Sequence, residues 1–292
     1  MHIYFLLVFS VLFWSGNFIL GRYAHGAIDP LTLNLFRWGT VTLILFPYIY
    51  TKKEIIIKAI KKDFGILFLL SALGIAGFNT ALYAGLQYTT ATNALLINSS
   101  IPVLIVLFNS EKITLKQMVG ILVSTLGVVY LVLKGEIANL AALQFNQGDL
   151  WIIATSIIWA LYSILIKKRP RYLSSFEFLS LISLIGFILL LISFFLLGNT
   201  LSYEVFDLGA EIYTIILYMA IFPSLLSFYF WNKGVAEIGA NKTGQFTHLM
   251  PLFGTLLAFV FLGEEVYLYH FVGISSIGLG IYLSLFLKNR VT

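Results

Sequence analysis

Polar and aromatic side chains recur at helical spacing inside segments of this sequence that are otherwise apolar. From Phe64 to Ser110 there is no Lys, Arg, Asp or Glu, yet amides, hydroxyls and tyrosines occur throughout the stretch. Residues three or four apart share one face of an α-helix, so most of these groups would present their side chains together. The candidate binding residues are Trp14, Asn17, Asn79, Tyr83, Asn98, Ser99, Trp159, Tyr162, Tyr229, Gln245 and His248.

Two groups of these polar residues lie about one helical turn before a proline. Asn98 precedes Pro102 in LINSSIPVLI, and the segment QFTHLM ends at Pro251. Proline has no N–H, so it leaves the carbonyl one turn earlier, here that of Asn98 or Thr247, without its usual helical partner. A substrate, a water molecule or a hydroxyl would have to satisfy each of these carbonyls.

Together these side chains predict a pocket lined by aromatic faces with a few amide, hydroxyl and imidazole groups. Such a lining suits a small zwitterionic or amphipathic solute, because rings attract cations while amides hydrogen-bond a carboxylate or an amine. Structural roles stay open. The tryptophans could pack the core, the amides could join helices, and His248 could form a fixed hydrogen bond or make a proton-sensitive substrate contact.

Arg37 stands apart as a positive charge within an apolar segment. It lies six residues after Leu31, about 9 Å along a helix axis. A charge at that depth reaches the interface, pairs with a carbonyl, or faces a polar cavity and attracts an anionic group. Charge recognition and a structural role both stay open. The nearest embedded carboxylate is Glu177, at a span end, so the usual proton relay at the midplane is not visible.

The elements that must position these side chains are membrane-spanning helices. The 292-residue chain is 60% hydrophobic and 11% charged, whereas ordinary soluble proteins carry about 25% charged residues. Its uncharged runs have the length that an α-helix needs to cross a hydrocarbon layer of about 30 Å. We expect ten spans, the first retained rather than cleaved as a signal peptide. They cover about 3–21, 31–50, 64–87, 91–109, 115–133, 149–167, 173–197, 210–232, 240–262 and 267–287.

Charge distribution indicates the orientation of these spans. With the N-terminus inside, 15 of the 18 Lys and Arg residues fall in inside segments. The positive-inside rule therefore predicts a multi-pass protein of the cytoplasmic (inner) membrane with both termini cytoplasmic. The basic patches could also touch anionic lipid. The chain has no cysteine, which excludes disulfides and thiolate metal sites, and we expect no cofactor, no metal and no nucleic-acid partner.

The sequence also carries a weak internal repeat. Displaced by 149 residues, Ile101-Pro102 falls on Met250-Pro251, and displaced by 145, Trp14 falls on Trp159. Five spans are an odd number, so the second half would enter the membrane from the opposite side. Inverted repeats of this kind place a substrate site near the midplane between the halves. We expect the repeats to occupy residues 1–135 and 149–288, and one chain already supplies both sides of the cavity, so a monomer suffices.

Several motifs follow one another in order along the chain, and the Glu…Gly…Gly pattern of the first half is answered in the second. The motifs are Trp14-Ser15-Gly16-Asn17-Phe18, Pro30 with Arg37, ALYAGLQYTTATNALLINSSIPVL, Glu111…Gln117-x-x-Gly120…Gly127, and Gly263-Glu264…Gly273…Gly280. In these motifs nearly the whole chain resembles the drug/metabolite transporter superfamily, specifically its ten-helix EamA-type exporters. The resemblance implies a central cavity lined by helices from both halves. The chain departs from the pattern at Asn109-Ser110-Glu111, where a Gly often precedes the Glu, and at Ile182, which stands where the second half would match Arg37. The paired glycines are expected to be close-packing faces.

These patterns favour a transporter that exports small metabolites, such as amino acids or related amphipathic compounds, by secondary active or facilitative transport with alternating access. Uptake of a metabolite is the alternative, because sequence does not set direction. A channel would need a continuous wet pore, which an aromatic lining disfavours. An enzyme is not expected. There is no Gly-x-x-x-x-Gly-Lys phosphate loop, no His-Glu-x-x-His, no Gly-x-Ser-x-Gly and no paired intramembrane Asp.

Overall fold

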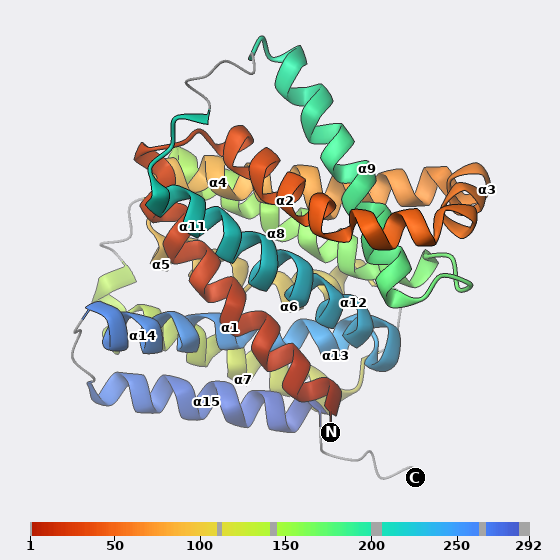
Figure 1. Ribbon diagram of the computed structural model, residues 1–292. Coiled ribbons are helices and arrows are strands. Elements are labelled where there is room, and N and C mark those ends of the chain that lie inside the picture. Colours follow the sequence, from red (N-terminus) through yellow and green to blue (C-terminus); the bar gives the residue numbers. More distant parts are fainter. Residues whose placement is uncertain (1, 110–112, 141–144, 200–205, 263–266, 286–292) are drawn as a thin grey trace, which may run out of the picture.

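The computed structural model describes residues 2–109, 113–140, 145–199, 206–262 and 267–285, and it shows a bundle of ten helical segments across these ranges (Figure 1). The first five segments are α1 (His2–Tyr23), α2 (Pro30–Thr51), α3 and α4 (Lys53–Ser71 and Phe78–Tyr88), α5 and α6 (Ala91–Asn98 and Ile101–Phe108), and α7 (Leu115–Val132). The second five are α8 (Gln147–Leu165), α9 (Ser175–Leu196), α11 and α12 (Ala210–Met219 and Ser227–Ile238), α13 and α14 (Ala240–Gly244 and Leu249–Leu262), and α15 (Leu268–Leu285).

The predicted all-α membrane fold is confirmed. Among the described residues, seven helices are long and apolar enough to cross a membrane, and a shorter apolar helix runs over Asn93–Phe108. One boundary differs from the prediction, because α3 begins at Lys53 rather than near residue 64. Its first turns are a basic, amphipathic segment that ends at the non-helical backbone of Asp63 (φ −125°, ψ 24°), so the membrane-spanning part starts after this kink.

Irregular turns interrupt the helices at matching places in the two halves. A π-helical segment, η2 (Ala72–Gly77), joins α3 to α4, and another, η5 (Ala220–Leu226), joins α11 to α12. Segment α5 stops before Pro102, and the 3₁₀ turn η6 (Gln245–His248) lies just before Pro251. Each proline removes a backbone donor, and π-bulges commonly mark functional positions.

Helices of the first half pair with antiparallel helices of the second half. Helix α1 packs on α12, with Leu7 against Gly234 and Ser10 hydrogen-bonded to the Ser227 carbonyl at 3.3 Å. Helix α4 packs on α8 in the same manner, with Gly85 against Ile152. In each pair residue numbers rise along one helix as they fall along the other, which is the arrangement that two inverted halves produce. The exact repeat boundaries, 1–135 and 149–288, stay a prediction.

The predicted glycine faces join α7 to α15, which lie side by side in Figure 1. A Cβ placed on Gly120 would lie 2.5 Å from the Gly280 carbonyl oxygen, and one on Gly127 would lie 2.9 Å from the Ile277 backbone nitrogen and 3.0 Å from the Gly273 carbonyl oxygen. Approaches below 3.0 Å leave no room for a side chain, so these two helices touch backbone to backbone. The motif residues Glu111 and Glu264 lie outside the described residues.

Short polar caps set the starts of several helices. At α9, the Ser174 hydroxyl accepts from the Glu177 N–H at 3.2 Å, while the Glu177 carboxylate accepts from the Ser174 N–H at 2.8 Å. This reciprocal capping box satisfies backbone donors that the first helical turn leaves free. Glu177 is therefore committed to a helix end rather than to the interior of the bundle.

Candidate functional site

An aromatic cluster lies where the two halves meet. The rings of Trp14 (α1) and Trp159 (α8) have centroids 5.0 Å apart at an interplanar angle of 84°, an edge-to-face contact. Trp231 stacks obliquely on both rings, at 5.1 and 5.6 Å. The Trp14 indole N–H donates to the Pro223 carbonyl in η5 at 2.9 Å, so the ring is held by both packing and a hydrogen bond.

Beside this cluster lies a small cavity walled by both halves. Its volume is about 10 Å³, room for about one water molecule. The lining residues come from α1, α4, α5, α6, α8, η6 and α14, and are Trp14, Asn17, Phe18, Phe78, Asn79, Asn98, Ile101, Trp159, Thr247 and Met250. The site is thus formed but closed, and a solute larger than water would need the walls to separate.

The polar wall at the broken helix comes from Asn98. Its side-chain Nδ2 donates to the Ala94 carbonyl at 3.1 Å, and its Oδ1 accepts from Ser156 at 3.2 Å and more weakly from Thr155 at 3.4 Å. The backbone carbonyls of Asn98 and Thr247 each precede a proline by four residues, so neither has the usual helical donor. Both residues line the cavity at equivalent places in the halves, and the Thr247 carbonyl accepts a backbone N–H at the end of η6.

Behind another part of the wall lies a group that we call the arginine cluster. Arg37 is 1% exposed. Its Nη1 donates to Asn79 Oδ1 at 2.7 Å, to the Tyr83 hydroxyl at 2.5 Å and to Asn17 Oδ1 at 3.3 Å, and its Nε donates to the Ser224 hydroxyl. Of these partners, Asn17 and Asn79 line the cavity. Every partner is neutral, and no carboxylate of the described residues forms an ion pair with the guanidinium.

The corresponding positions of the second half form what we call the counterpart cluster. The offsets that relate the halves place Tyr162 at Asn17, Ile182 at Arg37, Phe228 at Asn79 and Asn232 at Tyr83. All four are fully buried. The Tyr162 hydroxyl donates to Asn232 Oδ1 at 2.8 Å, just as the Tyr83 hydroxyl donates to Asn17 Oδ1 at 2.9 Å. The hydrogen bond is kept with its two residue types exchanged, but the charge is absent.

The imidazole of His248 lies between helices of the two halves rather than on the cavity wall. Its Nε2 is 3.0 Å from the Ser99 carbonyl and 3.4 Å from the Thr125 hydroxyl. The Nδ1 atom of His248 has no hydrogen-bond partner among the described residues. The same holds for the side-chain Oε1 and Nε2 atoms of the buried Gln245. His248 therefore joins the end of α5 and α7 to η6, whereas Gln245 is buried without a polar partner among the described residues.

The sequence-based site residues thus separate into three groups. Five line the cavity: Trp14, Asn17, Asn79, Asn98 and Trp159. A second set backs the wall: Arg37, Tyr83, Tyr162, Gln245 and His248. The remaining two point elsewhere. Tyr229 is half-buried against Phe176 of α9 at a centroid distance of 6.0 Å, and the Ser99 hydroxyl returns to the Leu96 carbonyl of its own helix.

Sequence reasoning missed part of the lining. Phe78 packs on Trp159 with centroids 4.7 Å apart, and it directly precedes Asn79, so the polar stripe on its helix could have indicated it. Thr247 lies within the QFTH segment that the proline pattern singled out. Ser224 lies 187 residues from Arg37, which it binds, and no spacing rule joins the two.

Tyrosine–carboxylate hydrogen bonds link the halves at the two ends of the bundle. At one end, the Tyr23 hydroxyl at the end of α1 donates to Glu211 at the start of α11 at 2.7 Å. At the other end, the Tyr172 hydroxyl after α8 donates to Asp63 in α3 at 2.5 Å. Tyr172 lies outside the spans, and loss of hydration together with the Asp63 hydrogen bond raises its pKa to about 12. Each bond joins one half to the other.

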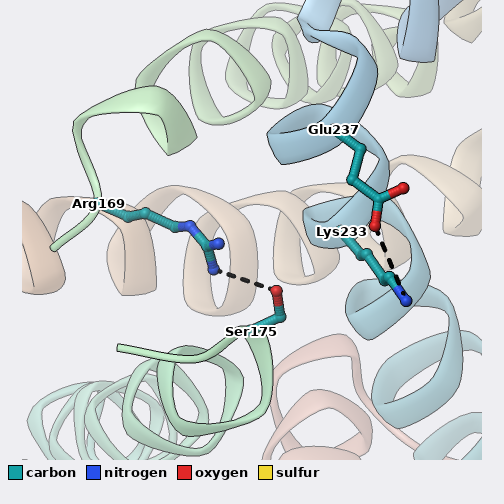
Figure 2. Close-up of polar contacts among 4 residues, drawn as sticks. All are labelled: Arg169, Ser175, Lys233 and Glu237. Atoms are coloured by element: carbon teal, nitrogen blue, oxygen red, sulfur yellow. Dashed lines mark hydrogen bonds and ion pairs between the residues drawn. The ribbon is translucent and has the colours of Figure 1, made fainter. Parts of the chain in front are cut away.

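Further polar contacts surround the Tyr172 end. Asn109 Nδ2 donates to Asn241 Oδ1 at 3.0 Å, and Lys167 donates to Asn109 Oδ1 at 3.2 Å, which joins three helix ends. Figure 2 shows Arg169 turned toward Ser175 at the start of α9, and Lys233 paired with Glu237 one turn along α12 at 3.8 Å. The last pair is exposed, and such pairs contribute little to stability.

Two larger hollows lie on the surface, away from the aromatic cluster. One, of about 290 Å³, is an apolar groove between α2, α9 and α11. The other, of about 580 Å³, is a shallow basic hollow on α3 that includes Lys58, Lys61 and Lys62. Neither is walled by the polar residues of the helix breaks, so the small central cavity remains the candidate site.

Comparisons with known proteins agree with this architecture. One protein chain of known crystal structure superposes on this chain with a TM-score of 0.76 at 18% sequence identity. The superposition covers 97% of this chain and 96% of that chain. That likeness shows the fold. In sequence, this chain is 26% identical to the uncharacterized transporter YyaM of Bacillus subtilis (strain 168), covering 96% of this chain and 92% of the relative.

A second relative comes from an archaeon. An uncharacterized transporter of Archaeoglobus fulgidus is 27% identical, covering 96% of each chain. The model of the EamA-like transporter family matches residues 1–133 and again residues 146–286, one match for each half. The chain is therefore a member of the EamA-like transporter family, within the drug/metabolite transporter superfamily.

Proposed function

We propose that this transporter exports small amphipathic metabolites, such as amino acids or related compounds, through the central cavity. The observation that carries the proposal is the composition of the cavity wall, in which aromatic residues, amide residues and a residue one turn before a proline from each half enclose one closed space. Transporters built from two halves hold their substrate at such an interface. The binding site we propose comprises the five lining residues predicted from the sequence together with Phe78 and Thr247.

The lining supports an amphipathic solute. Trp14, Trp159 and Phe78 offer apolar faces that also attract a cation. The break before Pro102 leaves the carbonyl of the lining residue Asn98 as an acceptor suited to an ammonium group, and Asn17 and Asn79 lie on another part of the wall. A substrate with an apolar body and polar ends would satisfy all three features, whereas a wholly apolar solute would leave the Asn98 carbonyl unpaired.

The closed cavity supports alternating access. A volume of about 10 Å³ excludes a metabolite, so the halves must part to admit one. The π-segments η2 and η5 and the breaks before Pro102 and Pro251 give both halves irregular backbone next to the cavity. We propose that the Tyr23–Glu211 and Tyr172–Asp63 bonds open in turn, one for each access state.

For orientation, we propose the cytoplasmic membrane with both termini in the cytoplasm. This rests on the charge distribution of the loops. Because the chain has no cysteine, Lys61→Cys and Lys134→Cys each introduce one thiol without background. A membrane-impermeant maleimide applied to intact cells should label the cysteine at position 134 and leave that at position 61 unlabelled. The reverse pattern would contradict the orientation.

Counterflow in proteoliposomes tests the transport proposal. Vesicles preloaded with an unlabelled amino acid should accumulate the radiolabelled form, and Trp159→Ala should reduce the initial rate at least about tenfold by removing part of the binding wall. Trp151→Ala is the matched control, because Trp151 is on the same helix but 43% exposed on its outer face. Absence of counterflow for every amphipathic metabolite offered would count against the proposal.

Direction is tested separately, since uptake of a metabolite is the alternative. Cells that produce the protein and are loaded with a dipeptide should release the derived amino acid faster than cells that produce Trp159→Ala. An imposed pH gradient across the proteoliposomes then separates proton-coupled from facilitative transport. Faster accumulation from the medium without faster release would favour uptake.

A further inference from the structure

The arginine cluster contains a buried positive charge that the described residues do not neutralise. Arg37 is 1% exposed, and its four hydrogen-bond partners are two amides, a phenol and an alcohol. Buried charges are normally paired with an opposite charge. The Nη2 group of Arg37 donates to none of the described residues. The guanidinium is therefore solvated by dipoles, but its charge is left without a counter-charge.

The cluster fixes how two wall amides face the cavity. A guanidinium can only donate, so the atoms of Asn17 and Asn79 that face Arg37 must be their oxygens. The Nδ2 of Asn79 donates to the Gly74 and Ile75 carbonyls, which lie in the π-segment η2. The Nδ2 of Asn17 donates to no described residue, and Asn17 lines the cavity. This amide N–H₂ is thus the donor offered to an occupant.

The cationic character is confined to one end of the site. In the counterpart cluster, Ile182 and Phe228 replace Arg37 and Asn79, and the Tyr162 hydroxyl donates to Asn232, neither of which lines the cavity. At the helix break the wall is formed by Asn98, whose backbone carbonyl is an acceptor and would repel an anion. An anionic group therefore has one favourable place in the cavity, beside Asn17 and in the field of Arg37.

We propose that Arg37, acting through Asn17 and Asn79, makes this end of the cavity a receptor for a singly charged anionic group, so that the transported solute carries a carboxylate. The inference rests on the proposed function and adds the charge of the substrate to it. Arg37 is a positioning residue here, because it orients the amide that would touch the solute and supplies the positive field behind it.

The decisive comparison uses wild-type protein purified in detergent and pairs of probes that differ only in the carboxylate. Phenylacetate is compared with phenylacetamide, and L-leucine with L-leucinamide, at constant ionic strength set with sodium chloride. Binding is followed by tryptophan fluorescence, because Trp14 and Trp159 line the cavity. Each carboxylate should bind at least about tenfold more tightly than its amide. Equal affinities, or no binding of either carboxylate, would overturn the proposal.

Variants then assign the preference to Arg37. Arg37→Gln keeps a polar side chain without the charge and should abolish the preference for carboxylates over the matched amides. Arg37→Lys should restore part of it. The matched control is Arg22→Gln, because Arg22 donates only to the Leu86 and Gln87 carbonyls at one end of the bundle, and it should keep the full preference. A carboxylate preference that survives in Arg37→Gln contradicts the assignment.

The two proposals fail in different ways. Counterflow of an uncharged or cationic solute, together with equal binding of carboxylate and amide, would leave the transporter in place and remove the carboxylate receptor. If Arg37→Gln does not yield folded protein, the wild-type comparison of carboxylates with amides still decides the charge preference, and Arg37→Lys decides the residue.

Discussion

The arginine cluster and the counterpart cluster occupy corresponding places in two halves of one family fold, but they differ in charge. Each contains a buried tyrosine–asparagine hydrogen bond, 2.9 Å long in the first half and 2.8 Å in the second. Only the first surrounds a guanidinium, and only there do the amides also line the cavity. Both halves therefore contain a hydrogen bond that joins helices, while only the first half contains a buried charge beside it.

This difference predicts that structural and recognition roles are separated within one motif. Tyr162 and Asn232 do not line the cavity, so their bond serves to hold α8 to α12. Asn17 accepts the hydrogen bond of Tyr83, which holds α1 to α4, and it also lines the cavity. Mutations at matched positions should consequently affect stability in both halves but substrate binding in only one.

The largest effect is expected when the charge is moved to the half that lacks it. Ile182 is fully buried, and Ile182→Arg would place a guanidinium among Phe228 and other apolar groups. Because Tyr162 and Asn232 already share a hydrogen bond and Phe228 stands where Arg37 has an amide acceptor, the variant should lose at least about 3 kcal/mol of stability, seen as a large fall in the thermal unfolding temperature or loss of monodisperse protein in detergent. Ile182→Leu is the control and should stay near wild type. A stable Ile182→Arg protein would show that the groups around position 182 can hydrogen-bond a guanidinium and that the second half tolerates a buried charge.

A smaller, graded effect should distinguish the two asparagines. Asn17→Ala removes the acceptor of Tyr83 and one acceptor of Arg37, so it should cost about 2–3 kcal/mol and weaken carboxylate binding. Asn232→Ala removes one neutral hydrogen bond and should cost about 1 kcal/mol with unchanged binding. Thermal unfolding and fluorescence titration of both variants measure the two properties. Equal losses of binding in the two variants would show that both clusters take part in recognition.

The smallest effect is expected at the ends of the bundle. Tyr172→Phe removes an exposed hydrogen bond to Asp63 and should cost less than about 1 kcal/mol near neutral pH. The folded-state pKa of Tyr172 is raised to about 12, above its ordinary value of about 10. This contribution is therefore complete below pH 10 and lost as pH rises through 12.

Thermal unfolding of wild type and Tyr172→Phe across this pH range provides the check, and the two curves should converge above pH 12. Tyr23→Phe is the comparison at the opposite end, where the bond is to Glu211. If the two hydrogen bonds hold alternate access states, the substitutions Tyr172→Phe and Tyr23→Phe should shift the populations of the inward-open and outward-open states in opposite directions, as measured by cysteine labelling from each side of the membrane. A shift in the same direction for both would rule out their opening in turn.

Composition and periodicity were enough to predict the helical membrane fold, because the length of an apolar run is set by bilayer thickness. The repeat identified which polar groups lie near the meeting of the halves, so Asn98 and Trp159 could be placed on the cavity from sequence. Tyr229 packs against Phe176, and its part in binding stays a prediction. Spacing shows which residues share a face but not toward which neighbour that face is turned.

The partners of Arg37 were beyond sequence reasoning for a related reason. Ser224 and Tyr83 lie on different helices, in different halves, and their approach depends on how π-segments and helix crossings place each backbone. Those irregular turns arise from tertiary packing, and π-segment η2 contains no proline that would mark it. The absence of a counter-ion could likewise be seen only once the neighbours were known.

The backbone contact between α7 and α15 has a consequence for how such a chain is assembled. Gly120 faces Gly280 while Gly127 faces Gly273, so each partner presents the same small-residue surface to the other in reverse order. That reciprocity is the defining property of a two-fold dimer interface. The seam within this single polypeptide is thus self-complementary, and it has the form through which two separate five-helix chains of opposite orientation would recognise each other.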